Sequence, residues 1–535
     1  MDQSAGTPTF DAIVIGAGPN GLVAANALAD AGWDVLVLEA QAEVGGAVRS
    51  GTVTADGFTT DLFSAFYPLA AASPLIRDLE LDRHGLEWVQ APNVLAHQLD
   101  DGRAAVLHRD PERTAAGLDE FAPGDGDAWL ELYGQWERIR DGLLSALFTP
   151  FPPVMAGTRM LRALRVAGAL RLARLGVTPV RRLGEELFRG DGGRLLLTGN
   201  AMHSDVPPDG AGSGMFGWLL AMLGQDVGFP VPKGGAGRLA EALRARAESL
   251  GAEVRTSSPV TEVLVRSRRA HAVRLADDTM ISARRAILAD VTAPALYGDL
   301  LDSVTLPSRV REDLTKFHWD HATLKLNWAL DAGVPWLAEE SRQAGTVHLG
   351  VDLDGFVDFA ADLSVGRLPA RPFVLFGQMT TADPSRSPDG TESAWAYSHL
   401  PRRLAADDAA VQELIGRVEA AVERVAPGFG DLVRARFVQT PLGLEATNAS
   451  LAGGALNSGT SAIHQQLVFR PTPGLGRAET PIDGLYLASA SAHPGGGVHG
   501  ACGWNAARSA LRANGRLGAL QSALVRTAWN RVLGS

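Results

Sequence analysis

The sequence predicts an α/β fold in which a Rossmann-type nucleotide-binding domain is interleaved with an α+β domain. Three separated stretches of the 535-residue chain indicate this. A strand, a glycine-rich turn and a helix follow one another over residues 11–31, short strands occupy 253–288, and a second strand, turn and helix occupy 484–517. Alternation of strands and helices favours a parallel sheet covered by helices. We expect the three stretches to meet in one such sheet.

The composition is that of an ordinary globular protein, with 46% hydrophobic and 20% charged residues. The net charge, 49 − 60 = −11, argues against a nucleic-acid partner, which would require a broad basic face. The single cysteine, Cys502, excludes a disulfide framework and a cysteine-based metal site, so no metal is expected. The first ten residues do not read as a secretory signal, and the longest apolar run, 214–224, is too short to span a bilayer. We expect a cytoplasmic protein.

The turn after the apolar run 11–15 has the spacing of a dinucleotide-binding turn. Gly16 allows a tight turn, Gly18 lets the backbone approach a pyrophosphate, and Gly21 lets the helix pack closely on the strand. Pro19 stands inside the same motif, where the helix N-terminus would offer free N–H groups to an anion. These four residues are predicted to bind the cofactor.

An acidic residue stands where such a domain needs one. Glu39 ends a second apolar strand, 34–38, and lies 18 residues after Gly21. Its carboxylate can accept both ribose hydroxyls, and its charge would repel a 2′-phosphate. A chance glycine turn is therefore a poor alternative.

The residues just after Glu39 distinguish between two dinucleotides. The segment VGGAVRS at 44–50 resembles the extension found in FAD-containing oxidoreductases of the amine oxidase and phytoene desaturase superfamily. Gly45 and Gly46 would let the backbone pass close to the flavin-side phosphate, and Arg49 would offer a cation. The alternative for Arg49 is an ordinary surface arginine at the end of a loop.

A second strand, turn and helix near the C-terminus is expected to complete the same site. The strand 484–488 is followed by a glycine-rich turn and by a helix over 506–517. Too few residues remain there for another dinucleotide-binding unit. NAD(P)H is therefore not the expected electron partner, and oxygen, a quinone or another carrier would reoxidise the flavin.

The whole pattern resembles the phytoene dehydrogenase-related FAD oxidoreductases, which include carotenoid desaturases and carotene ketolases. The stretches that carry the resemblance are GAGPNGLVAA, VPKGGAGRLAEAL and HPGGGVHGACGWNAAR. The resemblance implies non-covalent FAD, bound in part by Val260, Gly497, Gly500 and Ala501. Where many relatives have glycine and an acid after the last strand, this chain has Ser489 and Ala490, so no acidic contact is expected there.

The resemblance also implies two interleaved domains. The FAD-binding domain is expected to comprise residues 1–72, 229–300 and 451–535. The α+β substrate domain is expected to comprise 73–228, a mainly helical part, and 301–450, a mixed sheet.

Three residues are candidates for moving a proton. His493 and His499 lie in the loop that should border the flavin, but they could equally be packed loop histidines. Lys325 alternates with apolar residues along a predicted strand, 322–330. A lysine near the flavin occurs in amine oxidases, whereas an exposed strand lysine is the competing interpretation. For Cys502, a small buried thiol is expected rather than covalent attachment of flavin.

One stretch is basic although the whole chain has a negative net charge. Residues 142–184 contain no acid and seven arginines, interleaved with leucines at helical spacing. A peripheral membrane contact through 155–182 is one interpretation. A solvated helix face and an oligomer contact are the others.

The function predicted from the resemblance and these residues is dehydrogenation of a C–C bond in a hydrophobic, polyene- or isoprenoid-like small molecule, by hydride transfer to flavin N5. One alternative is a flavin amine or alcohol oxidase acting on a small molecule. It would need an aromatic pair beside the flavin, which a chain with five tyrosines makes less expected. The other alternative is a flavin-bearing interaction protein without turnover.

Overall fold

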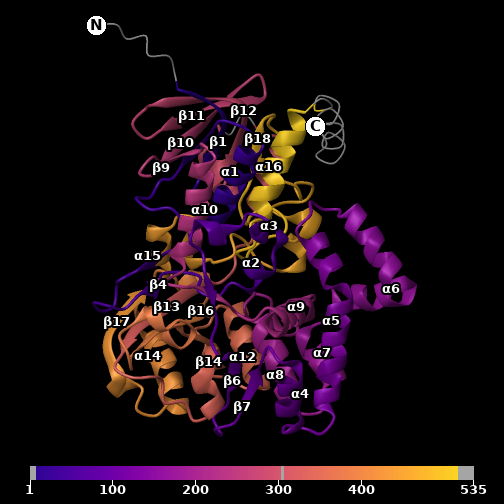
Figure 1. The fold of residues 1–535 in the computed structure, drawn as a ribbon, viewed down its shortest axis with the longest axis vertical. Helices are drawn as coiled ribbons and strands as arrows, with labels where there is room; N and C mark the ends of the chain where they lie inside the picture. The colour runs from indigo at the N-terminus through magenta and orange to yellow at the C-terminus, as the bar shows by residue number, and fades with distance from the viewer. Residues whose placement is uncertain (1–7, 303–305, 516–517, 519–535) are drawn as a thin grey trace.

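The computed structural model describes residues 8–302, 306–515 and 518. Two sheets lie at opposite ends of the molecule (Figure 1). One sheet contains β1 and β18, the first and last strands of the described chain, and the other carries the helices α8, α12 and α14 around it. The predicted α/β fold class is confirmed.

The first sheet is built around the run 11–15, whose buried side chains fit a strand covered on both faces. Five strands of the described chain run parallel in the order β18, β12, β1, β2, β9, and the antiparallel pair β10 and β11 extends it beyond β12. The strands are β1 (Thr9–Ile15), β2 (Val35–Leu38), β9 (Glu253–Arg255), β10 (Val260–Arg266), β11 (Arg269–Leu275), β12 (Met280–Ala289) and β18 (Leu485–Leu487).

Three helices pack against β1, β2 and β12 of this sheet. They are α1 (Pro19–Asp30), α10 (Gly237–Ser249) and α16 (Ala501–Ala513). α16 begins at Ala501, earlier than the sequence indicated. It crosses α1 so closely that a Cβ on Gly503 would lie 1.8 Å from the Asn20 carbonyl oxygen. The crossing brings the second glycine-rich loop next to the first.

The second sheet has the order β17, β13, β16, β15, β14, β6, β7 and is antiparallel except for the pair β14 and β6. A mainly helical part was expected over 73–228, and this expectation is wrong for β6 and β7. Polar residues buried in β6, among them His97, hide its strand pattern. The strands are β6 (Asn93–Gln98), β7 (Ala104–Leu107), β13 (Ala322–Leu330), β14 (Ala344–Leu349), β15 (Val374–Gln378), β16 (Glu392–Leu400) and β17 (Val433–Gln439).

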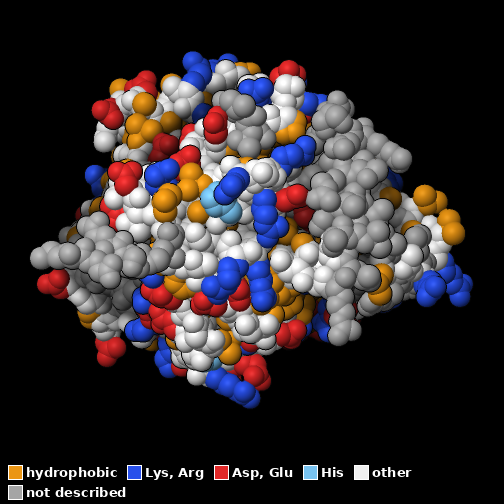
Figure 2. Space-filling view, turned by 90° about the horizontal axis from the view of Figure 1, so that it is seen from above, with side chains coloured by type: hydrophobic (Ala, Val, Ile, Leu, Met, Phe, Trp, Pro, Cys, Tyr) orange, Lys and Arg blue, Asp and Glu red, His pale blue; other side chains and the backbone are white. Residues whose placement is uncertain are grey.

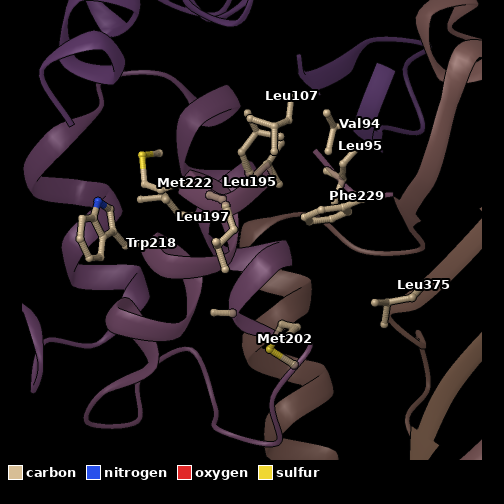
Figure 3. Close-up of a cluster of buried hydrophobic side chains, with 14 of the residues drawn as sticks. Val94, Leu95, Leu107, Leu195, Leu197, Met202, Trp218, Met222, Phe229 and Leu375 are labelled. Atoms are coloured by element: carbon tan, nitrogen blue, oxygen red, sulfur yellow. The ribbon is translucent and has the colours of Figure 1, made fainter. Parts of the chain in front are cut away.

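A helical layer packs on β6 and β7. Figure 3 shows this core, in which Leu195 and Leu197 of α8, Trp218 and Met222 of α9 and Leu107 of β7 belong to one cluster. The helices on this side are α4 (Pro111–Asp119), α5 (Asp125–Leu147), α7 (Val180–Leu187), α8 (Asp191–Ala201), α9 (Ser213–Asp226) and α12 (Leu353–Ser364), and α14 (Asp408–Val425) packs against the other side.

The remaining elements are short and connect these layers. They are β3 (Ser50–Gly51), β4 (Thr60–Asp61), β5 (Trp88–Val89), β8 (Val231–Pro232), α2 (Pro68–Ala72), α3 (Pro74–Arg77), α11 (Ser308–Leu314), α13 (Met379–Ala382) and α15 (Pro441–Thr447).

The basic stretch forms most of a projecting helix, α6 (Val154–Leu175), which is kinked at Arg165 (Figure 1). Val166 and Leu170 are 74% and 66% exposed. In Figure 2, hydrophobic and basic side chains lie together at the end of the molecule where this helix projects. The side chains at 159 and 161 lie outside the described residues. Membrane contact through 155–182 stays a prediction.

No helix in the described part of the chain is long and apolar enough to cross a membrane. The expected domain boundaries also stay a prediction. The segments expected to form the FAD-binding domain include residues 1–7, 516–517 and 519–535, which lie outside the described residues.

Candidate active site

A cavity of about 650 Å³ lies between the two sheets. One part of its wall comes from the glycine-rich turns of the first sheet, with Gly16 and Gly497 among the lining residues. The opposite part comes from the second sheet and from α9, with Lys325 and Leu219 among them. Both halves of the fold are therefore needed to form it.

The backbone at the start of α1 is shaped to take a ligand without side chains in the way. Gly16 has φ +93°, and a Cβ there would lie 2.8 Å from the Asp290 carbonyl oxygen. A Cβ on Gly18 would lie 2.7 Å from a carboxylate oxygen of Asp290, and one on Gly21 would lie 2.1 Å from the Gly16 carbonyl oxygen. Gly16, Gly18 and Pro19 line the cavity, whereas Gly21 supports the turn from behind.

An unsatisfied polar atom lies at the same place. Asn20, in the first turn of α1, lines the cavity and is 6% exposed, yet its Oδ1 has no hydrogen-bond partner in the described chain. A buried polar atom without a partner is costly. The cradle and this free acceptor fit a bound dinucleotide.

The sequence interpretation missed Asp290, at the end of β12. Its carboxylate accepts a hydrogen bond from the Gly21 N–H (2.8 Å) and lines the cavity. Burial raises the pKa of Asp290 to about 7, the Gly21 N–H opposes this shift, and Glu39 adds to it. An acid at the end of a predicted parallel strand beside the glycine turn was the signal that could have revealed it.

Glu39, the predicted ribose-binding acid, lies at the cavity, and its contact with a ribose stays a prediction. Glu39 lines the cavity, and its carboxylate accepts hydrogen bonds from the Ala17 N–H (2.7 Å) and the Gln41 N–H (2.9 Å). These bonds fix its orientation. Val260, expected near the adenine, also lines the cavity, at the start of β10.

The segment after Glu39 passes close to the glycine turn. Gly46 has φ +54° and lines the cavity, whereas Gly45 donates its N–H to the Ala17 carbonyl (2.8 Å) behind it. Arg49 is half-buried and lines the cavity, so it is not an ordinary surface arginine. Its guanidinium donates to the carbonyls of Gly46 (3.0 Å) and Thr447 (2.8 Å).

The C-terminal loop contributes Gly497, Ser489 and Ala490 to the cavity lining, but not Gly500 or Ala501. Gly500 caps α16, and a Cβ there would lie 2.9 Å from a methyl carbon of Val23 on α1. Gly500 and Ala501 therefore contribute to the packing of α16. Whether either residue contacts the cofactor stays a prediction.

The two loop histidines differ in position. His499 lines the cavity, but its Nδ1 accepts the Ala501 N–H (3.0 Å) and its Nε2 donates to the Gly495 carbonyl (3.3 Å). Both nitrogens therefore hold the loop. His493 does not line the cavity and packs against Phe151. Burial lowers the pKa of each histidine to about 4, which leaves both uncharged near neutral pH.

Cys502 is buried behind the same loop. Its thiol points at the carbonyls of Ala492 (3.6 Å) and Gly495 (3.7 Å), and burial raises its pKa to about 12. A neutral thiol is a poor nucleophile. These contacts agree with the expected small buried cysteine.

Lys325 is the candidate that the geometry favours for moving a proton. The interpretation as an exposed strand lysine is wrong, because both faces of β13 are covered and Lys325 is 4% exposed. It lines the cavity, and its amine donates to the carbonyls of Asp61 and Phe63. Burial lowers its pKa to about 7, and the nearby Asp61 carboxylate opposes this shift.

A buried ion network fixes the carbonyls that hold Lys325. Arg386 and Asp61 are both fully buried, with 3.0 Å between a guanidinium nitrogen and a carboxylate oxygen. Arg386 also pairs with Asp383 (2.8 Å), and Asp61 accepts the Ala236 N–H (2.7 Å). Through Asp61, the network links β4 to the segments that contain Ala236 and Arg386.

The cavity also has an aromatic pair that the sequence interpretation considered less expected. Trp395 and Tyr397 alternate along β16, both line the cavity, and their rings are stacked with centroids 5.8 Å apart. The Lys325 amine lies 5.2 Å from the Trp395 ring centroid. The alternation in β16 was visible in the sequence, but not which face met the cavity.

Comparison with known proteins decides the family. A model described as flavin containing amine oxidoreductase matches residues 20–511. This chain belongs to that family. FAD is its cofactor, and the protein is an FAD-dependent oxidoreductase.

The relatives include two proteins named for dehydrogenation. One component of the limonene dehydrogenase of Castellaniella defragrans is 27% identical over 93% of this chain and 94% of its own. The zeta-carotene-forming phytoene desaturase of Myxococcus xanthus is 26% identical, with 93% and 92% covered. A rat protein (Rattus norvegicus), pyridine nucleotide-disulfide oxidoreductase domain-containing protein 2, is 28% identical, with 94% of each chain covered.

A solved structure supports the fold. The cyclohexylamine oxidase of Brevibacterium oxydans superposes with a TM-score of 0.59, covering 94% of this chain and 99% of its own, at 18% identity. At that identity the likeness concerns the fold alone.

Asp290 should make FAD binding depend on pH. An ionised carboxylate beside the start of α1 repels an anionic pyrophosphate, so we expect the Kd of FAD to rise above pH 7, by up to about tenfold per pH unit. Asp290→Asn keeps an acceptor for the Gly21 N–H but carries no charge. Its FAD affinity, measured by calorimetry from pH 6 to 9, should be nearly flat.

The exposed Asp389 provides the control. Asp389→Asn should keep the wild-type dependence on pH. The same slope in Asp290→Asn would show that Asp290 does not sense the cofactor.

Proposed function

We propose that this protein is a dehydrogenase that introduces a C=C bond into an apolar substrate. The observation that carries the proposal is the apolar wall of the cavity, formed on one side by Phe216, Leu219, Leu220 and Leu223 of α9. A wall of this kind binds a substrate mainly by removing apolar surface from water. The relatives named for limonene dehydrogenase and phytoene desaturase support the same reaction type.

In this reaction one C–H bond is broken with its electron pair, the adjacent carbon loses a proton, and a C=C bond forms. FAD, when bound, supplies the acceptor for the hydride. The chain itself has to hold the substrate, exclude water and take the proton. In the proposal, neutral Lys325 takes the proton, because its lowered pKa leaves the amine substantially unprotonated at neutral pH.

The second candidate is oxidation of an amine. It is favoured by one observation, the stacked Trp395 and Tyr397 beside Lys325, which could guide a small cation toward the flavin. It is weakened by the extent of the apolar wall, which a small polar substrate would not need.

Anaerobic mixing of the holoprotein with candidate substrates separates these functions. We expect bleaching of the flavin absorbance by apolar alkenes such as limonene or farnesol, and none by putrescine or cyclohexylamine. Bleaching by the amines alone would establish the second candidate. Bleaching by none of a broad set would point to a flavin-bearing protein without turnover.

The role of Lys325 has a signature in the pH profile of flavin reduction. If the neutral amine takes the proton, the rate should rise with pH through about 7, where Lys325 loses its charge, and then level off. Lys325→Met keeps the apolar stem but has no amine. We expect flavin reduction to be about 10²–10⁴ times slower in this variant, and its rate should no longer rise with pH near 7. Both quantities are measured by stopped-flow absorbance.

Lys316 is 75% exposed and serves as the matched control. Lys316→Met should keep the wild-type rate of flavin reduction and its rise near pH 7. If the rise near pH 7 survives in Lys325→Met, another group accepts the proton.

A further inference from the structure

The cavity has polar side chains gathered in one region, here called the polar corner: Asn200, His203, Asp205, His321 and His399. Burial lowers the pKa of His399 to about 4, and His321, Asp205 and His203 all act on it electrostatically. The His321 and His399 rings lie 6.4 Å apart between centroids. These five residues come from three separate parts of the chain and meet around one space.

Most of the polar corner is separated from Lys325. His399 is the exception, because it lies two residues from Tyr397, which pairs with Lys325 across β13 and β16. His321 immediately precedes β13 and lies four residues before Lys325, which corresponds to about 13 Å of extended chain. His203 contacts His348, with 2.9 Å between their Nε2 atoms, and His348 lies three strands away from Lys325 in the same row of the sheet. The cavity therefore has two ends with different chemistry.

One buried polar atom of this corner has no protein partner. Asn200 is 1% exposed, lines the cavity, and uses its amide nitrogen on the Leu196 carbonyl (2.8 Å). Its Oδ1 has no hydrogen-bond partner in the described chain. His321 also lines the cavity, and Asp205, His318 and Arg402 act on it electrostatically. A buried acceptor without a partner is costly unless a ligand or water satisfies it.

The charges of the corner restrict what it can bind. Burial lowers the pKa of His203 to about 4, as it does for His399, so these rings are neutral near pH 7. Asp205 is an acceptor, already used by the Ser461 N–H (2.7 Å) and the Thr460 hydroxyl (2.5 Å). The cations that line the cavity, Arg49 and Lys325, both lie beside Phe63, at the other end. A carboxylate would find no lysine or arginine among the described residues that line this corner.

We propose that the substrate is an apolar molecule with a hydroxyl group at one end, which the polar corner binds while the apolar body lies along α9. A hydroxyl donates one hydrogen bond and accepts others, which matches the free Asn200 acceptor and the neutral imidazoles. It carries no charge that would have to be buried. The inference rests on the proposed function and names the substrate class of the same site.

Four probes with one C15 chain test this: farnesol, the hydrocarbon farnesene, farnesylamine and farnesoic acid. Their Kd values for the oxidised holoprotein, measured by calorimetry, report binding independently of turnover. We expect farnesol to bind at least about tenfold more tightly than farnesene and more tightly than the amine or the acid.

Two variants test whether the polar corner causes the tighter binding of farnesol. Asn200→Leu and His321→Phe each remove polar atoms that line the corner. Each should reduce the preference of farnesol over farnesene to about threefold or less, with farnesene binding unchanged. His271→Phe, at an exposed position on β11, should keep the full preference, and retained FAD absorbance verifies folding of each variant.

Equal affinity for farnesene and farnesol, tighter binding of the amine or the acid, binding of none of the four, or a preference that survives in both variants would each overturn the inference. The proposed function fails differently. In that case farnesol shows the expected preference, but no apolar alkene bleaches the flavin.

Discussion

The buried ion pair between Arg386 and Asp61 is the interaction on which the site depends. Breaking a buried pair by removing one partner typically costs about 3–5 kcal/mol, because a charge is left without compensation. Here the pair also orients the segment whose carbonyls, at Asp61 and Phe63, accept the Lys325 amine. The pair thereby joins β4 to the segment between β15 and β16 and holds in place the carbonyls that accept the Lys325 amine.

The same constraint explains the electrostatics of the cavity. Because the two sheets exclude water from the space between them, burial lowers the pKa of Lys325 and raises that of Asp290, both to about 7. Each group lines the cavity and is poised to change charge near neutral pH. The histidines of the polar corner are held neutral by the same burial.

The cofactor half of the site could be predicted from the sequence because its chemistry depends on residues close together in the chain. The glycine turn, Glu39 and the segment around Gly46 are local motifs, and the structure places them around one cavity. Asp290 was missed because it reaches the turn from a strand about 270 positions later, although its place at a strand end was a usable signal.

The substrate half could not be predicted in the same way. The stacked Trp395 and Tyr397, and the polar corner with Asn200 and His203, depend on which face of a strand or helix meets the cavity, and no local pattern states that. Lys325 shows the difficulty best, since its strand alternates as an exposed one would, yet helices and loops bury both faces. Only the assembled tertiary structure distinguishes these cases.

The most direct test of the central claim is the position of oxidation in the product. Farnesol can be incubated anaerobically with stoichiometric oxidised holoprotein, and the product analysed by nuclear magnetic resonance. We predict a new C=C bond remote from a retained hydroxyl group, because the hydroxyl lies in the polar corner, away from Lys325. An aldehyde at the hydroxyl-bearing carbon would contradict this.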